Sequence, residues 1–231
     1  MKILAIDTSG PCASAAVYAQ AHVVSQCAVE DARTHSETII SLIDFALTHA
    51  HVARSELDAV AVSNGPGSFT GLRIGVAIAK AMGQALQIPC IGVSTLDVLC
   101  YQAQGAPIAC AVMDARRKEV YSAAYRGKSC IVPHAPRPLD ELLAQLQPYA
   151  ERVAFCGDGV RVYRAQIEQA LGERAAFAPA PYDVQLAGSV AMLAAQMPEA
   201  AYDDAFSLLP NYLRLSQAER ERLERGGQSR G

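Results

Sequence analysis

The same short pattern occurs twice in the sequence, near the start and near the middle. Residues 2–7, KILAID, form an apolar run that ends at Asp7, and residues 106–114, APIACAVMD, form another that ends at Asp114. A turn and a second strand-like run follow each of them, SAAVYA after the first and KEVYSAAYR after the second. This recurrence predicts two structurally similar halves, each of which opens with antiparallel strands.

Further strands and helices are expected to alternate along the chain. A third strand, AHVVSQCAVE, precedes a helix over residues 34–50, and the strand LDAVAVSNG leads into a long helix that ends near Leu86. The strand IPCIGV, a helix over residues 94–104, and the strand, Gly-Asp-Gly turn and helix of VAFCGDGVRVYRAQIEQAL follow. The alternation predicts an α/β fold with mixed sheets. The runs rich in proline and alanine at residues 133–138 and 176–181 are expected to be loops.

Composition narrows the functional class. With 231 residues, 51% of them hydrophobic, the chain can form one large or two small domains, and its net charge of −3 gives no general attraction to nucleic acid or acidic membranes. Seven cysteines without a C-x-x-C pair are typical of reduced cytosolic thiols. The apolar run directly before Asp7 has only four residues, and no apolar run approaches the roughly 20 residues of a membrane span. We therefore expect a soluble, cytoplasmic protein without a membrane partner.

The paired aspartates resemble those of the superfamily that contains actin, the sugar kinases and Hsp70, whose fold is also called ASKHA or RNase H-like. In that architecture, acid-tipped turns from the two halves face each other across a cleft and handle nucleotide phosphate. Taken alone, each aspartate fits two interpretations equally well: a phosphate-handling residue, or an ordinary turn residue or helix cap. The resemblance marks a set of vestigial nucleotide-binding residues, namely Asp7, Ser9, Asp114, Gly157 and Asp158.

One longer stretch is more specific. Residues 63–75, SNGPGSFTGLRIG, together with IDTS at 6–9, HSE at 35–37, MDARRKEVY at 113–121 and PNYLR at 210–214, resemble the bacterial TsaB (YeaZ) family of the actin-like superfamily. The likeness is dense in the first half and sparse over residues 128–209. It implies an N-terminal actin-like subdomain over residues 1–106, a C-terminal one over 107–214 and a charged tail over 215–231.

The resemblance implies a required but non-catalytic subunit in tRNA modification. In that family the sibling subunit TsaD transfers a threonylcarbamoyl group from its adenylate to the adenosine beside the tRNA anticodon, and the ATPase TsaE joins the pair. TsaD siblings carry an H-x-E-G-H metal motif, and counting without gaps brings it onto residues 95–99. Thr95 and Leu99 then occupy the histidine positions, so we expect neither a metal site nor a cofactor.

Other catalytic motifs are absent from the sequence. H-S-E-T-I at residues 35–39 is not H-E-x-x-H, and Ser68 lies outside any G-x-S-x-G frame, which disfavours a protease. The glycine-rich loop lacks the Lys-Ser or Lys-Thr pair of a Walker loop. The main alternative to a scaffold subunit is an actin-fold ATPase or kinase that uses Asp7 and Asp114.

The helix after the glycine-rich loop has more apolar surface than one sheet can cover. Between residues 72 and 86 its charged or amide side chains are Arg73, Lys80 and Gln84, and the helix over residues 34–50 is similarly apolar in its middle. Small residues at positions 71, 75, 79 and 83 predict a groove for a partner helix. The alternative is that both helices are internal, covered by the C-terminal segment. The predicted partner-binding residues are His35, Ile39, Ile43, Ser68, Phe69, Leu72, Arg73, Gly75, Val76, Ala79 and Gly83, with a homodimer expected when the partner is absent.

Overall fold

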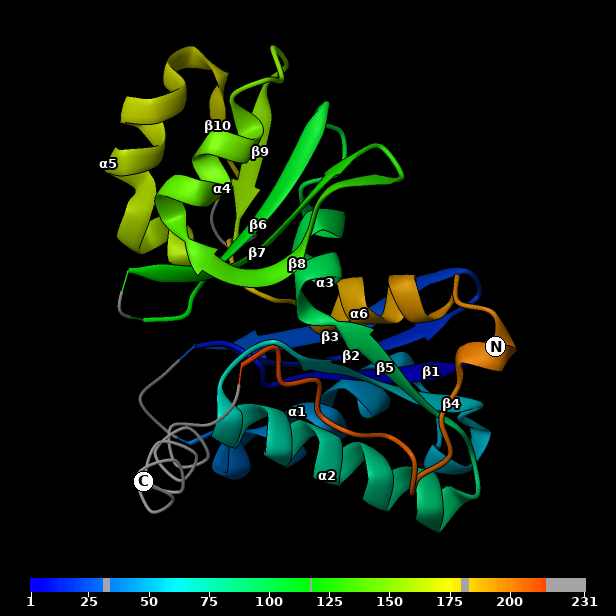
Figure 1. Ribbon diagram of the computed structural model, residues 1–231. Helices are drawn as coiled ribbons and strands as arrows, with labels where there is room; N and C mark the ends of the chain where they lie inside the picture. The colour runs from blue at the N-terminus through cyan, green and yellow to red at the C-terminus, as the bar shows by residue number, and fades with distance from the viewer. Residues whose placement is uncertain (31–33, 117, 180–182, 215–231) are drawn as a thin grey trace, which may run out of the picture.

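The structure is a computed structural model that describes residues 1–30, 34–116, 118–179 and 183–214 (Figure 1). Its first half is built on a five-stranded sheet with the order β3-β2-β1-β4-β5. Strands β1 and β2 and strands β2 and β3 pair antiparallel, whereas β4 runs parallel to β1 and β5 parallel to β4. The strands are β1 Ile3–Asp7, β2 Ala13–Ala19, β3 His22–Val29, β4 Ala59–Gly65 and β5 Cys90–Ser94.

The second half repeats this topology strand for strand. Its sheet has the order β8-β7-β6-β9-β10, with antiparallel pairing among β6, β7 and β8 and parallel pairing of β9 with β6 and of β10 with β9. The strands are β6 Ile108–Asp114, β7 Glu119–Arg126, β8 Ser129–Pro138, β9 Val153–Cys156 and β10 Ala175–Phe177. The predicted pair of similar halves with mixed sheets is therefore confirmed, and Asp7 and Asp114 end equivalent strands.

Helices cover both faces of each sheet, which explains the continuous apolar runs of the central strands. Alternate residues of β1 point to opposite sides: Leu4 and Ile6 pack with α1 and α2, while Ile3 and Ala5 pack with α6. In β6 the residues at 108, 110 and 112 likewise face α4 and α5. The helices are α1 His35–Ala50, α2 Phe69–Leu86, α3 Thr95–Gln102, α4 Leu139–Leu146, α5 Gly159–Leu171 and α6 Ala187–Ala194, with short 3-10 turns at Arg54–Glu56, Gly172–Arg174 and Glu199–Ala201.

The last helix of each half crosses to the sheet of the other half (Figure 1). Helix α3 follows β5 of the first sheet, yet Leu96, Leu99 and Cys100 pack on β6 and β7 of the second. Helix α6 follows β10 of the second sheet and packs on β1, β2 and β4 of the first. This reciprocal exchange places α3 and α6 in the middle layer and holds the two halves together.

The exchange corrects the expected subdomain boundaries. Residues 187–208 do not stay with the C-terminal half, because α6 packs on the first sheet and Leu208 is buried in the core beside α2, whereas Leu213 and Arg214 return to the second half. The physical reason is that each sheet needs a helix on its inner face, and only the other half supplies one. The expected loop at residues 133–138 is also wrong, since it forms the end of β8, and the second expected loop begins within β10. The charged tail lies outside the described residues.

Candidate functional site

The glycine-rich loop between β4 and α2 is held against the turn that follows β1. The Ser68 amide donates to the Ser9 carbonyl at 2.8 Å, and the Thr8 hydroxyl donates to the Gly71 carbonyl at 2.7 Å. Ser68 caps α2, because its hydroxyl accepts the Gly71 amide at 3.2 Å. A Cβ at Gly71 would lie 2.0 Å from the Thr8 carbonyl oxygen, so glycine is required for this approach.

The small-residue face of α2 packs inside the chain, which corrects the prediction of an open groove. A Cβ at Gly75 would lie 2.5 Å from the Thr8 hydroxyl, and one at Gly83 would lie 2.6 Å from the Cys90 sulfur. Leu72, Val76 and Ala79 on the same side are also buried. The repeat of small residues serves close packing of the helix on its own sheet, so the alternative of an internal face holds for these positions.

The open face of α2 lies on the opposite side of the helix. Ala77, Ala81 and Ala85 are exposed there, and each follows one of the buried small residues by two positions, which is about 200° around the helix. Short side chains therefore line the solvent-facing side as well. This face is smooth and almost uncharged, with Arg73 at its beginning.

Phe69 at the start of α2 stacks on Tyr212 from the C-terminal segment. The ring centroids are 4.6 Å apart and the planes differ by 10°. Arg73 joins them: its Nε donates to the Tyr212 hydroxyl at 3.1 Å, and its guanidinium lies about 6 Å from both rings. Sequence reasoning placed Phe69 and Arg73 in the site but missed Tyr212, although the PNYLR motif contains it.

The C-terminal segment, residues 203–214, runs along α2 (Figure 1). Asp203 pairs with Cys90 on the edge strand β5, and the Lys80 ammonium donates to the carbonyls of Phe206 and Leu208 at 3.1 Å each. Helix α1 packs mainly on β2 and β3, and α2 packs mainly on β4. Helix α1, helix α2 and this segment therefore lie side by side under the first sheet, and we call them the outer layer.

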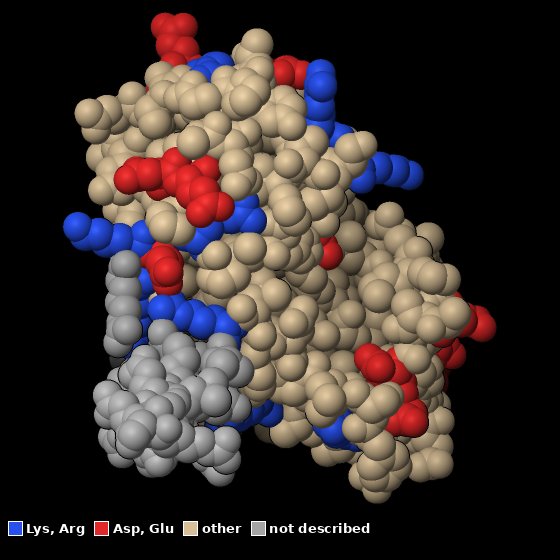
Figure 2. Space-filling view, viewed as in Figure 1, with Lys and Arg blue, Asp and Glu red and all other residues tan. Residues whose placement is uncertain are grey.

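The outer layer carries most of the exposed large apolar side chains in the described part of the chain. Five of the seven belong to it: Ile40, Phe45, Phe206, Leu209 and Tyr212. In Figure 2, much of the surface on the viewed side carries neither acidic nor basic groups. Of the other residues predicted on α1, Ile39 and Ile43 are buried and His35 bonds the Gly10 carbonyl at 2.8 Å, so these three support the layer from within.

A cleft of about 620 Å³ opens between the two halves above the glycine-rich loop. Ser9, Asp114 and Asp158 line it, together with Gly10, Pro11, Gly67, Ser68, Phe69, Thr70, Met113, Ala115, Arg116, Tyr121 and Arg214. Three of the five predicted nucleotide-binding residues thus meet at one place. Gly157 lies beside Asp158 with a φ of +119°, where a Cβ would lie 2.2 Å from the Val112 carbonyl oxygen.

Asp7 does not reach this cleft. Its carboxylate is fully buried, with one oxygen accepting the amide and hydroxyl of Ser9 at 2.8 Å each and the other accepting the Ser63 hydroxyl. Burial raises the pKa of Asp7. Both carboxylate oxygens are occupied inside the protein, so this residue organises the turn and is not free to hold a phosphate-bound cation.

Asp158 is the more exceptional carboxylate of the cleft. Burial, and after it the negative charge of Asp114, raises its pKa to about 6, and one of its oxygens is buried without a hydrogen-bond partner in the described structure. Thr95 and Leu99, at the histidine positions of the metal motif, are fully buried in α3. No group of three histidine, cysteine or acidic side chains within residues 1–30, 34–116, 118–179 and 183–214 is arranged to hold a metal ion.

Comparison with known proteins gives consistent results. The sequence model of the family described as "TsaD: tRNA N6-adenosine threonylcarbamoyltransferase" matches residues 29–222. The tRNA threonylcarbamoyladenosine biosynthesis protein TsaB of Bacillus subtilis is 31% identical over 97% of this chain and 99% of its own length. The TsaB of Escherichia coli is 36% identical over 54% of this chain and 55% of its own length.

Solved structures agree with the sequence matches. YeaZ from Pseudomonas aeruginosa superposes with a TM-score of 0.76 at 27% identity, covering 91% of this chain and 99% of that one. A ROK hexokinase from Thermus thermophilus superposes with a TM-score of 0.51 at 13% identity, covering 83% of this chain and 97% of that one, which shows a shared fold alone. Within the described residues, no helix is both long and apolar enough to cross a bilayer.

Proposed function

This chain belongs to the TsaB family of tRNA threonylcarbamoyladenosine biosynthesis proteins, and we propose that it acts there as a non-catalytic subunit that docks a TsaD-type transferase. Its role is then to fix the geometry of the partner's active site. An independent actin-fold ATPase or kinase is the weaker alternative, because the matched relatives are named for tRNA modification.

The outer layer is the observation that carries this proposal. Exposed apolar side chains gather at partner-binding surfaces, and a face of alanines lets a second helix approach closely. Ile40 and Phe45 project from α1, which packs beside α2, and Phe206, Leu209 and Tyr212 lie in the segment that Lys80 of α2 holds. We place the TsaD-type partner on this layer, with Phe69 and Arg73 at its edge. Ser68 caps the helix that presents these residues, and Leu72, Val76 and Ala79 anchor that helix to the sheet.

The non-catalytic role is supported by the residues of the cleft and of α3. Asp7 is engaged by Ser9 and Ser63, and threonine and leucine stand where a transferase of this superfamily has histidines. Leucine has no lone pair with which to ligate a metal. We propose that Ser9, Asp114, Gly157 and Asp158 are the remains of a nucleotide site. Any nucleotide held there would be bound weakly and would not be turned over.

The same proposal covers the remaining partners. A TsaE-like ATPase joins the pair, tRNA is met through the assembled complex, and the isolated chain forms a homodimer on the layer that otherwise receives the transferase. The net charge of −3 supports contact with tRNA through the complex, because the chain has no overall positive field to attract RNA by itself. We place the protein in the cytoplasm with the tRNA.

Binding to a purified TsaD-type subunit tests the proposal. Ile40→Glu and Phe45→Glu each place a charge in the apolar part of the outer layer and should weaken binding at least tenfold. Val162→Glu is the matched control, because Val162 is 60% exposed but lies on α5 in the other half. All three variants should melt like the parent protein. Unchanged binding by both α1 variants would overturn the proposal.

A further inference from the structure

A second cavity lies apart from the cleft described above and shares none of its lining residues. It has a volume of about 920 Å³ and is bordered by Ser94, Asp97 and Tyr125. Most of its wall is apolar or small, including Val93, Ala109, Leu193 and Met197, with Asn64, Gln104, Lys128, Gln196 and Asn211 as polar groups. The proposed role in tRNA modification assigns no function to this cavity, and of the outer layer only Asn211 lines it.

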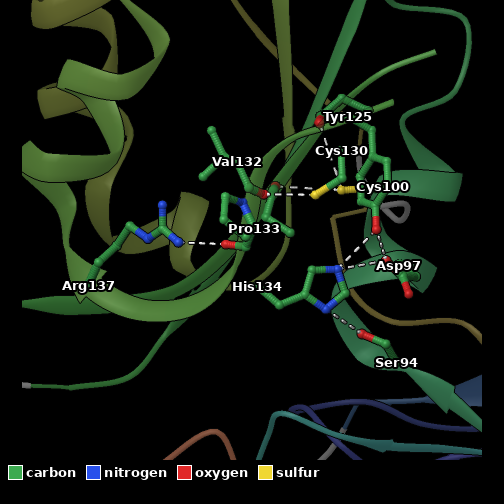
Figure 3. Close-up of polar contacts among 11 residues, drawn as sticks. Ser94, Asp97, Cys100, Tyr125, Cys130, Val132, Pro133, His134 and Arg137 are labelled. Carbon is green, nitrogen blue, oxygen red and sulfur yellow. Dashed lines mark hydrogen bonds and ion pairs between the residues drawn. The ribbon is translucent and has the colours of Figure 1, made fainter. Parts of the chain in front are cut away.

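Three of the residues that line this cavity, Ser94, Asp97 and Tyr125, meet a fourth side chain, His134 (Figure 3). The His134 ring on β8 has Nε2 2.9 Å from the Asp97 carboxylate and Nδ1 3.4 Å from the Ser94 hydroxyl. The Tyr125 hydroxyl donates to the same Asp97 oxygen at 2.7 Å and lies 3.1 Å from His134 Nε2. Serine, histidine and aspartate thus form a continuous hydrogen-bonded chain.

The hydrogen bonds specify which ring nitrogen carries the proton. Asp97 is an acceptor, so His134 places its proton on Nε2, where the carboxylate receives it. Nδ1 is then an acceptor directed at the Ser94 hydroxyl, so the ring can take the serine proton as a general base, with its two nitrogens in the reverse of their roles in the Ser-His-Asp triad. Burial, and after it the bond to Asp97, raises the pKa of Tyr125, so its hydroxyl keeps its proton and helps to hold the carboxylate. The separation of 3.4 Å is within the range of resting sites whose bonds shorten when substrate binds.

The Ser94 hydroxyl is not used by the helix that Ser94 precedes. Ser94 is the N-cap of α3, yet its side chain makes no capping hydrogen bond and is directed to His134 instead. The first amides of α3 are therefore not capped by this hydroxyl. Next to it, the Thr95 hydroxyl is buried and has no hydrogen-bond partner in the described structure.

We propose that Ser94, His134 and Asp97 form a hydrolytic site for small carboxylic esters in this cavity. The Ser94 oxygen attacks the ester carbonyl carbon while its proton passes to His134 Nδ1. The bond to the leaving alcohol breaks, and His134 gives the alcohol that proton. Water then attacks the Ser94 ester and gives a proton to His134, which returns it to the Ser94 oxygen as the carboxylic acid leaves. Ser94 and His134 are the catalytic residues, and Asp97 is a positioning residue.

Covalent labelling and ester turnover test this site in the intact chain. Diisopropyl fluorophosphate should add one phosphoryl group to Ser94 with loss of fluoride, located by peptide mass mapping, and p-nitrophenyl butyrate should be hydrolysed. Ser94→Ala should abolish both, and His134→Asn should lower turnover by about 10²–10⁴-fold. Asp97→Asn should lower kcat with little change in KM. Ser129→Ala is the matched control, because Ser129 is exposed on the same strand as His134.

Each outcome decides the proposal. Labelling at Ser94 that the His134 variant loses and the Ser129 variant keeps supports it. An unlabelled parent protein, labelling at another serine, or turnover that survives Ser94→Ala would overturn it. Thermal melts show whether a variant loses labelling only because it unfolds. If a variant melts like the parent protein and is not labelled, the loss of labelling is due to the site. Since the outer layer is untouched, partner binding should persist in every variant.

Discussion

Phe69 and Tyr212 stack ring on ring with their centroids 4.6 Å apart, which joins the start of α2 to the end of the described chain. Arg73 bridges the two rings. Beside them, the backbone amide of Asn211 donates to the backbone carbonyl of Asn64 at 2.6 Å, so the C-terminal segment is held at two neighbouring points. The glycine-rich motif at residues 63–75 and the PNYLR motif at residues 210–214 therefore build a single surface.

A double-mutant cycle on this pair gives the first prediction. Phe69→Ala and Tyr212→Ala should show a coupling free energy of about 0.5–1.5 kcal/mol, the usual value for stacked aromatic pairs. Urea unfolding of the parent protein, both single variants and the double variant measures it. Tyr212→Phe is the control, because it keeps the stack and removes only the hydrogen bond from Arg73. Additive losses would show that the rings do not support each other.

The two small-residue faces of α2 give the second prediction. Gly75→Leu should destabilise the fold by about 1–3 kcal/mol or more, because even its Cβ would lie 2.5 Å from the Thr8 hydroxyl and 3.2 Å from a Val62 methyl. The melting temperature should fall by about 2–4 °C for each kcal/mol. Ala77 is two residues further along and exposed. Ala77→Leu should therefore leave the melting temperature near that of the parent protein and should instead weaken binding to the TsaD-type partner. A parent-like melt for Gly75→Leu would contradict the internal packing.

The raised pKa of Asp158 gives the third prediction. Its folded-state pKa of about 6 exceeds the ordinary value of 3.8, so the folded protein binds a proton that the unfolded chain releases between these values. The stabilisation from this group is complete below about pH 4 and is lost as the pH rises through 6. Asp158→Asn should therefore raise the free energy of unfolding at pH 7.5, by up to roughly 3 kcal/mol at about 1.4 kcal/mol per pKa unit.

Urea unfolding at pH 5 and pH 7.5, with chelator present, measures this effect. The variant should differ less from the parent protein at pH 5, where Asp158 is mostly protonated. Thr70→Ala is a useful comparison, because Thr70 lines the same cleft, is exposed and does not titrate. An equal change at both pH values would mean that the charge of Asp158 is not the cause.

The sequence predicts the sheets better than it predicts the surface. A strand that is buried on both faces must be apolar throughout, so it can be recognised in the sequence. Two such runs, ending at Asp7 and Asp114, therefore indicate two equivalent halves. The same pattern cannot tell which face of α2 is covered, since Gly75 and Ala77 are both small and only the contact with Thr8 distinguishes them. The exchange of α3 and α6 is equally hidden, because it depends on contacts between distant segments. The meeting of Ser94, Asp97 and His134 needs the second sheet in place, which no local motif reports.

Self-association through the outer layer is the final prediction. A two-fold homodimer that pairs α1 and α2 with their copies would cover Ile40 and Phe45, and stable interfaces usually bury about 1,200–2,000 Å² in total. Sedimentation of the isolated chain should therefore show a dimer at high concentration. Phe45→Glu should shift it to a monomer, since two copies of the new carboxylate would face an apolar contact, whereas Val162→Glu should remain a dimer. Adding the TsaD-type subunit should replace the homodimer by a mixed pair, because both partners compete for one layer. A dimer that persists in Phe45→Glu, or that binds the transferase without dissociating, would place the two interfaces on different faces.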